Sequence, residues 1–195
     1  MSKDERHAHI ISTAKSLFGQ YGYDHVTIAD VINASNIARG TFYLHFNSLE
    51  SLLTALFDQV VDETWRRIAP ILNDLSIPFQ TCTIEVVRAV FRMFYDDPSM
   101  AMVFHSGGGR AFVERKQEAM FNKLGALLQD ALKRRHGTNL DHIEWTVAML
   151  ITLVGNMPGY ATLYVKASEK AAFEEKLIDF VLAGLRDHLS PIIDL

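Results

Sequence analysis

The sequence is poor in the features that mark secreted, membrane-bound or disulfide-stabilised proteins. Its 195 residues contain one cysteine, Cys82, which excludes an internal disulfide and a metal site built from several cysteines. No apolar run approaches the roughly 20 residues that a membrane helix needs. The longest run extends from Val147 to Val154, and the opening Met-Ser-Lys-Asp-Glu-Arg is too polar for a signal peptide. We therefore expect a soluble cytoplasmic protein with no membrane partner.

Positive charge is also scarce. The chain has 19 Lys and Arg against 23 Asp and Glu, a formal net charge of −4, which weighs against a protein that binds polyanions over its whole surface. The first 50 residues hold only Lys3, Arg6, Lys15 and Arg39 as permanent cations. Any DNA binding must therefore depend on well-placed individual contacts, with a weak non-specific component and a clear dependence on salt.

Apolar residues are abundant, at 49% of the chain, and recur at helical spacing. We find no β alternation of useful length, so the pattern predicts an all-α protein of about nine helices. The expected helices cover residues 4–21, 38–45, 48–72, 78–97, 110–136 and 169–189, with others after Thr27, after Pro98 and after a cap at Asp141. Gly155, Pro158 and Gly159 are expected to kink or break the helix that Asp141 caps.

These helices suggest two domains. Residues 1–47 are expected to form a small three-helix domain with a helix-turn-helix, and residues 48–195 a larger helical domain for ligand binding and dimerisation. The helix that begins at Ser48 would join the two rigidly.

The segment from Thr27 to Phe46 has the arrangement of a helix-turn-helix. Thr27 and Asp30 have the spacing of a capping box at the start of the first helix. Asn36 suits a tight corner because asparagine tolerates positive φ better than most residues. On the second helix Phe42 and Phe46 point inward, which leaves a face of small, polar and aromatic side chains with no reason to be buried.

That outward face predicts contacts with DNA in the major groove. An arginine at position 39 can pair with guanine, and the methyl group of Thr41 can meet a thymine methyl. Gly40 lets the backbone approach DNA closely, while hydroxyl and imidazole groups reach phosphates. The predicted DNA-binding residues are Thr27, Arg39, Gly40, Thr41, Tyr43, Leu44 and His45. The plainer alternative is a helical corner without a ligand, since such corners are common.

From about Ile10 to Leu56 the chain resembles the N-terminal domain of TetR-family (tetracycline-repressor-like) transcriptional regulators. The resemblance covers about a quarter of the chain. The matching stretches are Ala14-Lys-Ser-Leu-Phe-Gly-Gln-Tyr-Gly22, Thr27-Ile-Ala-Asp-Val31, Gly40-Thr-Phe-Tyr-Leu-His-Phe46 and Glu50-Ser-Leu-Leu53.

The resemblance implies a homodimer that reads a pseudo-palindromic double-stranded DNA operator, with recognition helices about 34–36 Å apart. Binding of a ligand in the larger domain would release the DNA. The family's roles make Thr27 and Tyr43 phosphate contacts, and place Arg39, Gly40, Thr41 and Leu44 at base-facing positions. One departure is Leu49, where the family usually has a lysine that contacts phosphate.

The larger domain carries no diagnostic motif, but methionine and aromatic residues can line an adaptable apolar pocket. The effector is expected to be a small apolar or amphipathic molecule, because the segment has few cations. The predicted ligand-binding residues are Phe94, Met102, His105, Arg110, Trp145, Met149, Asn156 and Tyr160. The alternative is that these side chains fill the core or lie at helix ends.

Two apolar stripes on the last helices predict a dimer surface in the form of a four-helix bundle. The alternative is that both stripes face their own chain's core. The stripes contain Ala172, Phe173, Leu177, Phe180, Val181, Leu185 and Leu189 in the last helix, and Val147, Leu150, Ile151 and Val154 in the one before it.

Enzymatic chemistry finds no support in the sequence. No Gly-x-Ser-x-Gly elbow follows a strand, and no histidine pair has helical ligand spacing. We therefore predict no catalytic residues, no metal site and no cofactor. Two hypotheses remain: a ligand-responsive transcriptional repressor, and a helical small-molecule-binding protein that has lost DNA binding.

Overall fold

The computed structural model describes residues 1–137 and 142–189, and within these ranges the chain is helical without strands. The helices are α1 (Lys3–Tyr21), α2 (Ile28–Ser35), α3 (Arg39–His45), α4 (Leu49–Asn73), α5 (Phe79–Asp96), α6 (Ser99–Phe104), α7 (Arg110–Gln117), α8 (Gly125–His136), α9 (Ile143–Tyr164) and α10 (Lys170–Leu189). Short turns of 3-10 helix, η1 (Tyr23–His25) and η3 (Ala167–Glu169), and a π-helical segment, η2 (Glu118–Leu124), complete the described part. The all-α prediction is confirmed.

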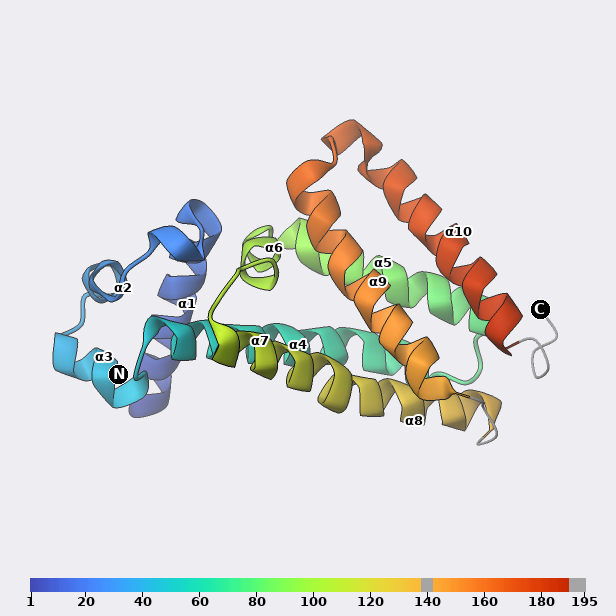
Figure 1. The fold of residues 1–195 in the computed structure, drawn as a ribbon, viewed down its shortest axis with the longest axis horizontal. Helices are drawn as coiled ribbons and strands as arrows, with labels where there is room; N and C mark the ends of the chain where they lie inside the picture. The colour runs from blue at the N-terminus through green and yellow to red at the C-terminus, as the bar shows by residue number, and fades with distance from the viewer. Residues whose placement is uncertain (138–141, 190–195) are drawn as a thin grey trace.

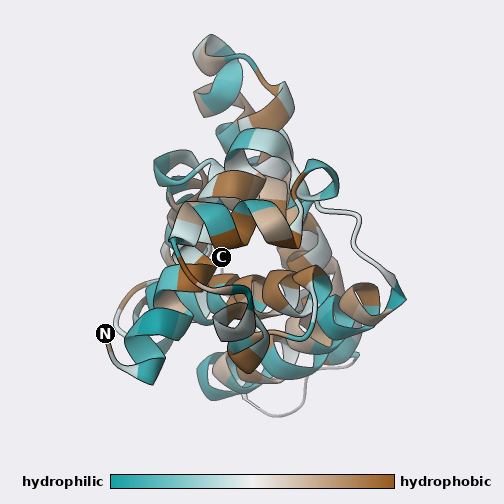
Figure 2. Ribbon diagram, turned by 90° about the vertical axis from the view of Figure 1, so that its left-hand side faces the viewer, coloured by the Kyte–Doolittle hydropathy of each residue, from teal (hydrophilic) through white to brown (hydrophobic). Residues whose placement is uncertain are grey.

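The molecule is elongated, with α1–α3 at one end and α10 near the other (Figure 1). The long helix α4 leaves the α1–α3 end and runs beside α7 and α8, while α5, α9 and α10 lie on its other side. Figure 2 looks at the α1–α3 end and shows single helices that carry both hydrophilic and hydrophobic stretches. One cluster of buried apolar side chains continues from Ile10 in α1 to Ile151 in α9, so the two predicted domains share a core.

Local chemistry sets the helix ends in the N-terminal region. Ser2, Thr27 and Ser48 each accept a hydrogen bond from the backbone N–H three residues on, and each cap is completed as a capping box. Asn36 ends α2 in the left-handed conformation, with φ 50° and ψ 50°. The predicted caps at Thr27 and Ser48 and the corner at Asn36 are confirmed.

Residues 110–136 form one continuous helix, as predicted, although its middle is π-helical. In this segment Gly125 donates its backbone N–H to the carbonyl of Met120, five residues back. The wider turn changes which side chains share a face before and after it. Apolar periodicity alone did not predict this change in winding.

The predicted break in the penultimate helix is wrong. α9 continues from Ile143 to Tyr164 with Pro158 inside it. Pro158 and Gly159 are buried, so packing holds together a stretch that local preference disfavours. Asp141, the predicted cap, lies outside the described residues, and His142 occupies the N-cap position.

α9 is also the helix in the described ranges whose length and hydropathy would suit a bilayer. It packs against α5, α6, α8 and α10, and 33% of its most apolar window is buried in the fold. A core helix passes the same test of length and composition, so this feature is weak evidence for a membrane.

The N-terminal helices meet the larger bundle where α1 packs on α6. A Cβ on Gly19 would lie 2.5 Å from the Cβ of Ser99, so this contact leaves no room for a side chain. An ion pair between Lys15 and Asp97 supports the same junction. Nearby, the carboxylate of Glu50 in α4 accepts the backbone N–H of Phe112 in α7 at 3.1 Å. The two regions are therefore joined by close contacts besides the continuous α4.

Candidate nucleic-acid interface and effector cavity

The helix-turn-helix is braced from inside by fully buried side chains. Val31 of α2 and Phe42 of α3 have no exposed area. The hydroxyl of Ser35 donates to the carbonyl of Val31 at 2.6 Å, and a ring nitrogen of His9 in α1 lies 3.1 Å from the carbonyl oxygen of Ser35. These contacts hold α2 and α3 at a fixed angle against α1.

The opposite face of α3 is open to solvent. Leu44 is 78% exposed and Tyr43 is 43% exposed, and Arg39 and Gly40 are also exposed. The Arg39 guanidinium lies 5.8 Å from the centroid of the Tyr43 ring, a cation–π contact that orients both groups. A Cβ on Gly40 would meet no atom within 4 Å, so nothing in the described protein requires a glycine there. The open backbone at this position is suited to close approach by an external partner.

Two other predicted DNA contacts, Thr41 and His45, are half-buried on α3. The ring of His7 in α1 stacks on Phe46 at 4.7 Å and lies 5.6 Å from the ring of His45. Burial, then the neighbouring His7, lowers the pKa of His45, and Lys3 and Arg6 act in the same direction while Asp4 opposes them. The lowered pKa favours the neutral ring of His45, which is suited to hydrogen bonding more than to ionic attraction.

Thr27 is exposed, as its predicted role requires, but its hydroxyl is already engaged. It donates to the carboxylate of Asp30 at 2.6 Å and accepts the backbone N–H of Asp30 at 3.3 Å. Hydrogen bonds from the Thr27 side chain and then its backbone lower the pKa of Asp30. Leu49, the departure from the family pattern, is half-buried and packs against the core at the start of α4. Its apolar side chain therefore packs on the core at the position where the family usually has a lysine that contacts phosphate.

A cavity of about 100 Å³ lies inside the larger bundle. It is lined from α4, α5, η2–α8, α9 and α10 by Thr64, Ile68, Leu72, Phe79, Cys82, Thr83, Val86, Val87, Val90, Met120, Leu124, Leu128, Leu132, Leu150, Ile151, Val154, Gly155, Val181 and Leu185. The space is several times what one water molecule needs.

The cavity wall offers almost no hydrogen-bonding capacity. The hydroxyl of Thr64 donates to the carbonyl of Val60 at 2.8 Å, and that of Thr83 donates to the carbonyl of Phe79 at 3.0 Å. Burial raises the pKa of the Cys82 thiol, so it stays protonated and behaves as a small apolar group. The interior of the cavity is therefore suited to hydrocarbon.

None of the eight predicted ligand-binding residues lines this cavity. Trp145 and Met149 are 61% and 52% exposed on the outer face of α9, and Tyr160 lies exposed farther along the same helix. Methionine and aromatic content suggested a pocket lining, but helical phase places these three side chains on the surface.

The remaining five predicted ligand residues are also engaged elsewhere. The exposed guanidinium of Arg110 pairs with Glu114 at 2.7 Å, and the amide of Asn156 donates to the carbonyl of Thr152 at 2.6 Å. Phe94 is buried in the core. Met102 and His105 lie at α6, against Gly22 and Gly159 respectively.

The residues that do line the cavity carried a signal in the sequence. Met120, Leu124, Leu128 and Leu132 recur at every fourth position along one helix. That spacing is typical of a buried helix face, and sequence reasoning overlooked it in favour of aromatic content.

The predicted dimer stripes divide between the core and the surface. Val147, Ile151, Leu177, Val181 and Leu185 are buried within their own chain, so that part of the prediction is wrong. Of the remaining stripe residues, the Leu189 side chain lies outside the described residues. Phe180 of the predicted stripe is exposed, and Trp145, Met149, Tyr160 and Tyr164 of α9 are the other large exposed apolar residues described in the two helices. A shallow hollow nearby is lined by Leu153, Phe173, Lys176, Leu177 and Phe180.

Comparison with known proteins agrees with this geometry. Residues 10–56 match the family described as bacterial regulatory proteins, tetR family. The uncharacterized HTH-type transcriptional regulator YfiR of Bacillus subtilis is 35% identical over 66 residues, which cover 34% of this chain. That match spans only 32% of the length of YfiR. YerO, another such regulator from Bacillus subtilis, is 25% identical over 97% of this chain and 69% of its own.

Two solved structures share the fold at low identity. The fatty acid degradation regulator FadR from Bacillus halodurans has a TM-score of 0.75 and 19% identity, with 93% of this chain and 96% of that chain covered. The transcriptional regulator FadR from Bacillus subtilis, solved in complex with stearoyl-CoA, has a TM-score of 0.72 and 16% identity, with 91% and 98% covered. The braced helix-turn-helix therefore lies within the residues that match the family described as bacterial regulatory proteins, tetR family.

Proposed function

We propose that this protein is a cytoplasmic transcriptional repressor that binds a pseudo-palindromic operator as a homodimer and is released by a small apolar or amphipathic effector. The observation that carries the proposal is the face of α3, which is held rigidly from behind and exposes Arg39, Gly40, Tyr43 and Leu44. We place the DNA-binding domain at residues 1–47 and the effector-binding and dimerisation domain at residues 48–195.

Base reading in this proposal rests on the exposed face of α3. Arg39 pairs with a guanine, Gly40 and Thr41 allow close approach, and Leu44 contacts a thymine methyl. Tyr43 and the N-terminus of α2 at Thr27 contact phosphates, and the orphan N–H groups of α2 assist there because the Thr27 hydroxyl is used by the cap. His45 contributes a neutral hydrogen bond at the edge of the interface.

Dimerisation is supported by the exposed aromatic and methionine side chains of α9 and α10. A monomer rarely exposes a large contiguous apolar patch, and such patches mark contact surfaces. Packing α9 and α10 against their copies would form a four-helix bundle and place two α3 helices on one side of a duplex.

The effector site in this proposal is the apolar cavity between α4, α5, α8, α9 and α10 in place of the eight residues first predicted. FadR from Bacillus subtilis was solved with stearoyl-CoA, a ligand with a long acyl chain, on a similar fold. The wall at Gly155 and Met120 adjoins Phe104 of α6, and α6 packs on α1 at Gly19. Filling the cavity would therefore shift α6 and change the separation of the two reading helices.

A gel-shift assay with the DNA upstream of the protein's own gene tests this proposal. Wild-type protein should shift the fragment at low salt, and unlabelled fragment but not a scrambled sequence should compete. The variant Val90→Phe, which would fill the cavity, should keep the shift and lose its release by a hydrophobic effector. No shift at low salt, with retained binding of a hydrophobic probe, would favour the rival small-molecule-binding protein.

A further inference from the structure

The helix from α7 to α8 presents a side chain to the cavity at every fourth position. Met120, Leu124, Leu128 and Leu132 all line it. Four residues of a regular α-helix overshoot a full turn by about 40°, so such a series would normally drift off one face. The π-helical segment winds more slowly and offsets part of this drift. Lys116 lies four residues before Met120 and so belongs to the same series.

Lys116 is a cation in largely apolar surroundings. Its Nζ lies 4.4 Å from the centroid of the Phe104 ring and 5.6 Å from that of Phe57, and it donates to the backbone carbonyl of Phe104. Burial lowers the pKa of this amine. An ammonium group has three donors, and the described residues accept only one of them, so the group can bind a further acceptor.

No carboxylate in the described ranges forms an ion pair with Lys116. Three acidic residues of α4 face this helix but are engaged elsewhere. Asp58 pairs with Arg115 at 3.1 Å, Asp62 pairs with Lys123 at 2.5 Å, and Glu50 accepts the backbone N–H of Phe112. The charge of Lys116 is therefore uncompensated by any described carboxylate, which is costly for a half-buried cation.

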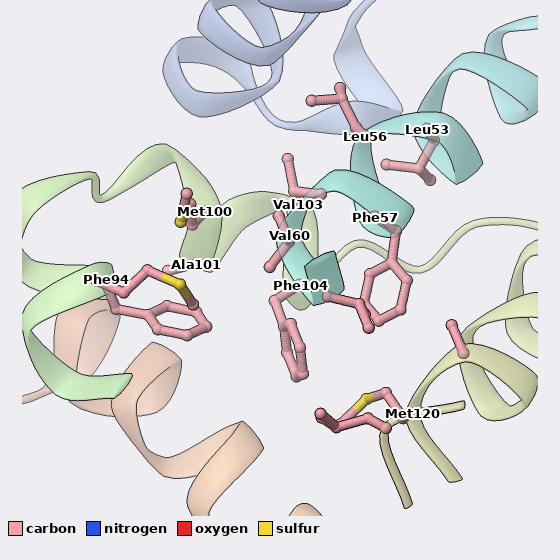
Figure 3. Close-up of a cluster of buried hydrophobic side chains, with 14 of the residues drawn as sticks. Leu53, Leu56, Phe57, Val60, Phe94, Met100, Ala101, Val103, Phe104 and Met120 are labelled. Carbon is pink, nitrogen blue, oxygen red and sulfur yellow. The ribbon is translucent and has the colours of Figure 1, made fainter. Parts of the chain in front are cut away.

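Phe104 joins this cation to the cavity. A Cβ on Gly155, which lines the cavity, would lie 3.0 Å from the Met120 methyl carbon and 3.8 Å from Cζ of Phe104. Figure 3 shows the Phe104 ring among Phe57, Phe94 and Met120. Met120 and Phe104 therefore lie together beside the cavity wall at Gly155, and Phe104 also contacts Lys116.

We propose that the effector is an amphipathic anion whose hydrocarbon chain lies along Met120, Leu124, Leu128 and Leu132 and whose carboxylate binds Nζ of Lys116. The proposal rests on the cavity being the effector site of the proposed function. The chain finds an apolar wall with satisfied hydroxyl groups, and the carboxylate supplies the charge and acceptors that Lys116 lacks. Entry of the carboxylate requires the Phe104 ring to turn aside.

A purely structural role for Lys116 makes a different prediction. The amine would then only cap the last carbonyl of α6 and tie it to α7. Loss of the charge would lower stability without changing which ligands the cavity prefers. Discrimination between a carboxylate and a neutral ligand of the same chain length therefore separates the two roles.

Titration calorimetry with decanoate and decan-1-ol tests the proposal on wild-type protein and two variants. The wild type should bind decanoate at least about tenfold more tightly, as expected for a charge-assisted hydrogen bond in an apolar site. Lys116→Met should lose this preference and keep its affinity for decan-1-ol within about twofold, since the aliphatic stem is retained. Lys123→Met, an exposed lysine of the same helix, should behave as the wild type.

Equal wild-type affinity for the two ligands, binding of neither, or a preference that survives in Lys116→Met would overturn the proposal. If Lys116→Met does not fold by circular dichroism, Lys116→Gln replaces it, and Lys116→Arg should keep the preference for decanoate. The gel shift measures the proposed function separately. If the protein binds DNA but does not distinguish the two ligands, only the carboxylate site at Lys116 is contradicted. If it distinguishes the ligands but does not bind DNA, only the proposed function in transcription is contradicted.

Discussion

Two exposed helical surfaces of this protein differ in chemistry. The outer face of α3 shows one arginine, a glycine, a tyrosine and a leucine on a short helix. The outer faces of α9 and α10 show Trp145, Met149, Tyr160, Tyr164 and Phe180. At 1.5 Å per residue, the four residues of α9 extend over roughly 28 Å.

Each surface suits a different partner. Small side chains and an open glycine let backbone enter a groove whose edges offer hydrogen-bond acceptors and methyl groups. Large aromatic side chains offer area but few hydrogen bonds, which suits a protein surface of the same kind. In the proposed function α3 reads DNA while α9 and α10 pair the subunits, and separate experiments test these two assignments.

The largest effect is expected at the apolar surface. Phe180→Asp should convert the dimer to a monomer, because a carboxylate would be buried without a partner in the contact. Loss of two-site binding should then lower operator affinity about a hundredfold or more. Light scattering and gel shift measure the two effects. Leu75→Asp, at an exposed apolar residue between α4 and α5, should change neither. A Phe180→Asp protein that stays dimeric would refute the assignment of this surface.

Substitutions on α3 should have smaller effects on DNA affinity, and these effects should depend on the DNA sequence. Arg39→Ala should cost about 1–3 kcal/mol of discrimination between cognate and scrambled DNA. Tyr43→Phe should weaken binding to both by a few-fold, because a lost phosphate contact carries no sequence information. Competition gel shifts measure both ratios. Arg39 is not a base reader if the Arg39→Ala protein retains the full preference of the wild type.

A gain is expected at the start of α4. Leu49→Lys should raise operator affinity a few-fold at low salt and steepen its dependence on salt by about one counterion. Part of the gain is offset because Leu49 packs on the core. Binding isotherms at several salt concentrations measure the slope, with Leu49→Met as the uncharged control. An unchanged slope would mean that the introduced amine does not reach a phosphate.

The smallest effect concerns pH and the end of α8. Burial, then Arg135, lowers the pKa of His136, and one of its ring nitrogens is buried without a hydrogen-bond partner in the described structure. The unfolded chain takes up this proton near pH 6.5 and the folded chain only at lower pH. Stability from this group is therefore full above about pH 6.5 and is lost as the pH falls toward the folded value.

Thermal unfolding at pH 7.5, 6.5 and 5.5 should show this loss in the wild type. His136→Phe should reduce the slope, because phenylalanine keeps the edge contact with Phe79 and does not titrate. His45 and His105 also have lowered pKa values, so some dependence on pH should remain. Identical slopes in the two proteins would show that His136 contributes nothing measurable.

The helix-turn-helix was predictable because the sequence signals that set its helix ends are local. A threonine followed by Asp30 caps α2, an asparagine turns the chain at positive φ, and Ser48 starts α4. Each depends on residues within three or four positions, so the sequence is sufficient to predict it. The exposed face of α3 followed by elimination, once Phe42 was assigned to the core.

The cavity was not predictable in the same way because five separated helices form it. Trp145 and Met149 have the composition of a ligand site, but they lie one turn apart on the face of α9 that turns outward. Packing with α5, α8 and α10 decides whether that face is buried or exposed, and the periodicity of the sequence does not predict this packing. Pro158 shows the same limit, since burial keeps α9 continuous through a residue that usually ends a helix.

The wide turn between α7 and α8 also acts as a phase adjuster for everything that follows it. If residues 118–124 took ordinary α-helical winding with none of them removed, α8 would rotate by about 100° relative to α7. Leu128 and Leu132 would then swing away from the hollow although neither had been replaced. Removing one residue from the segment would largely cancel that rotation, so the single extra residue of the wide turn sets which face α8 turns to the cavity.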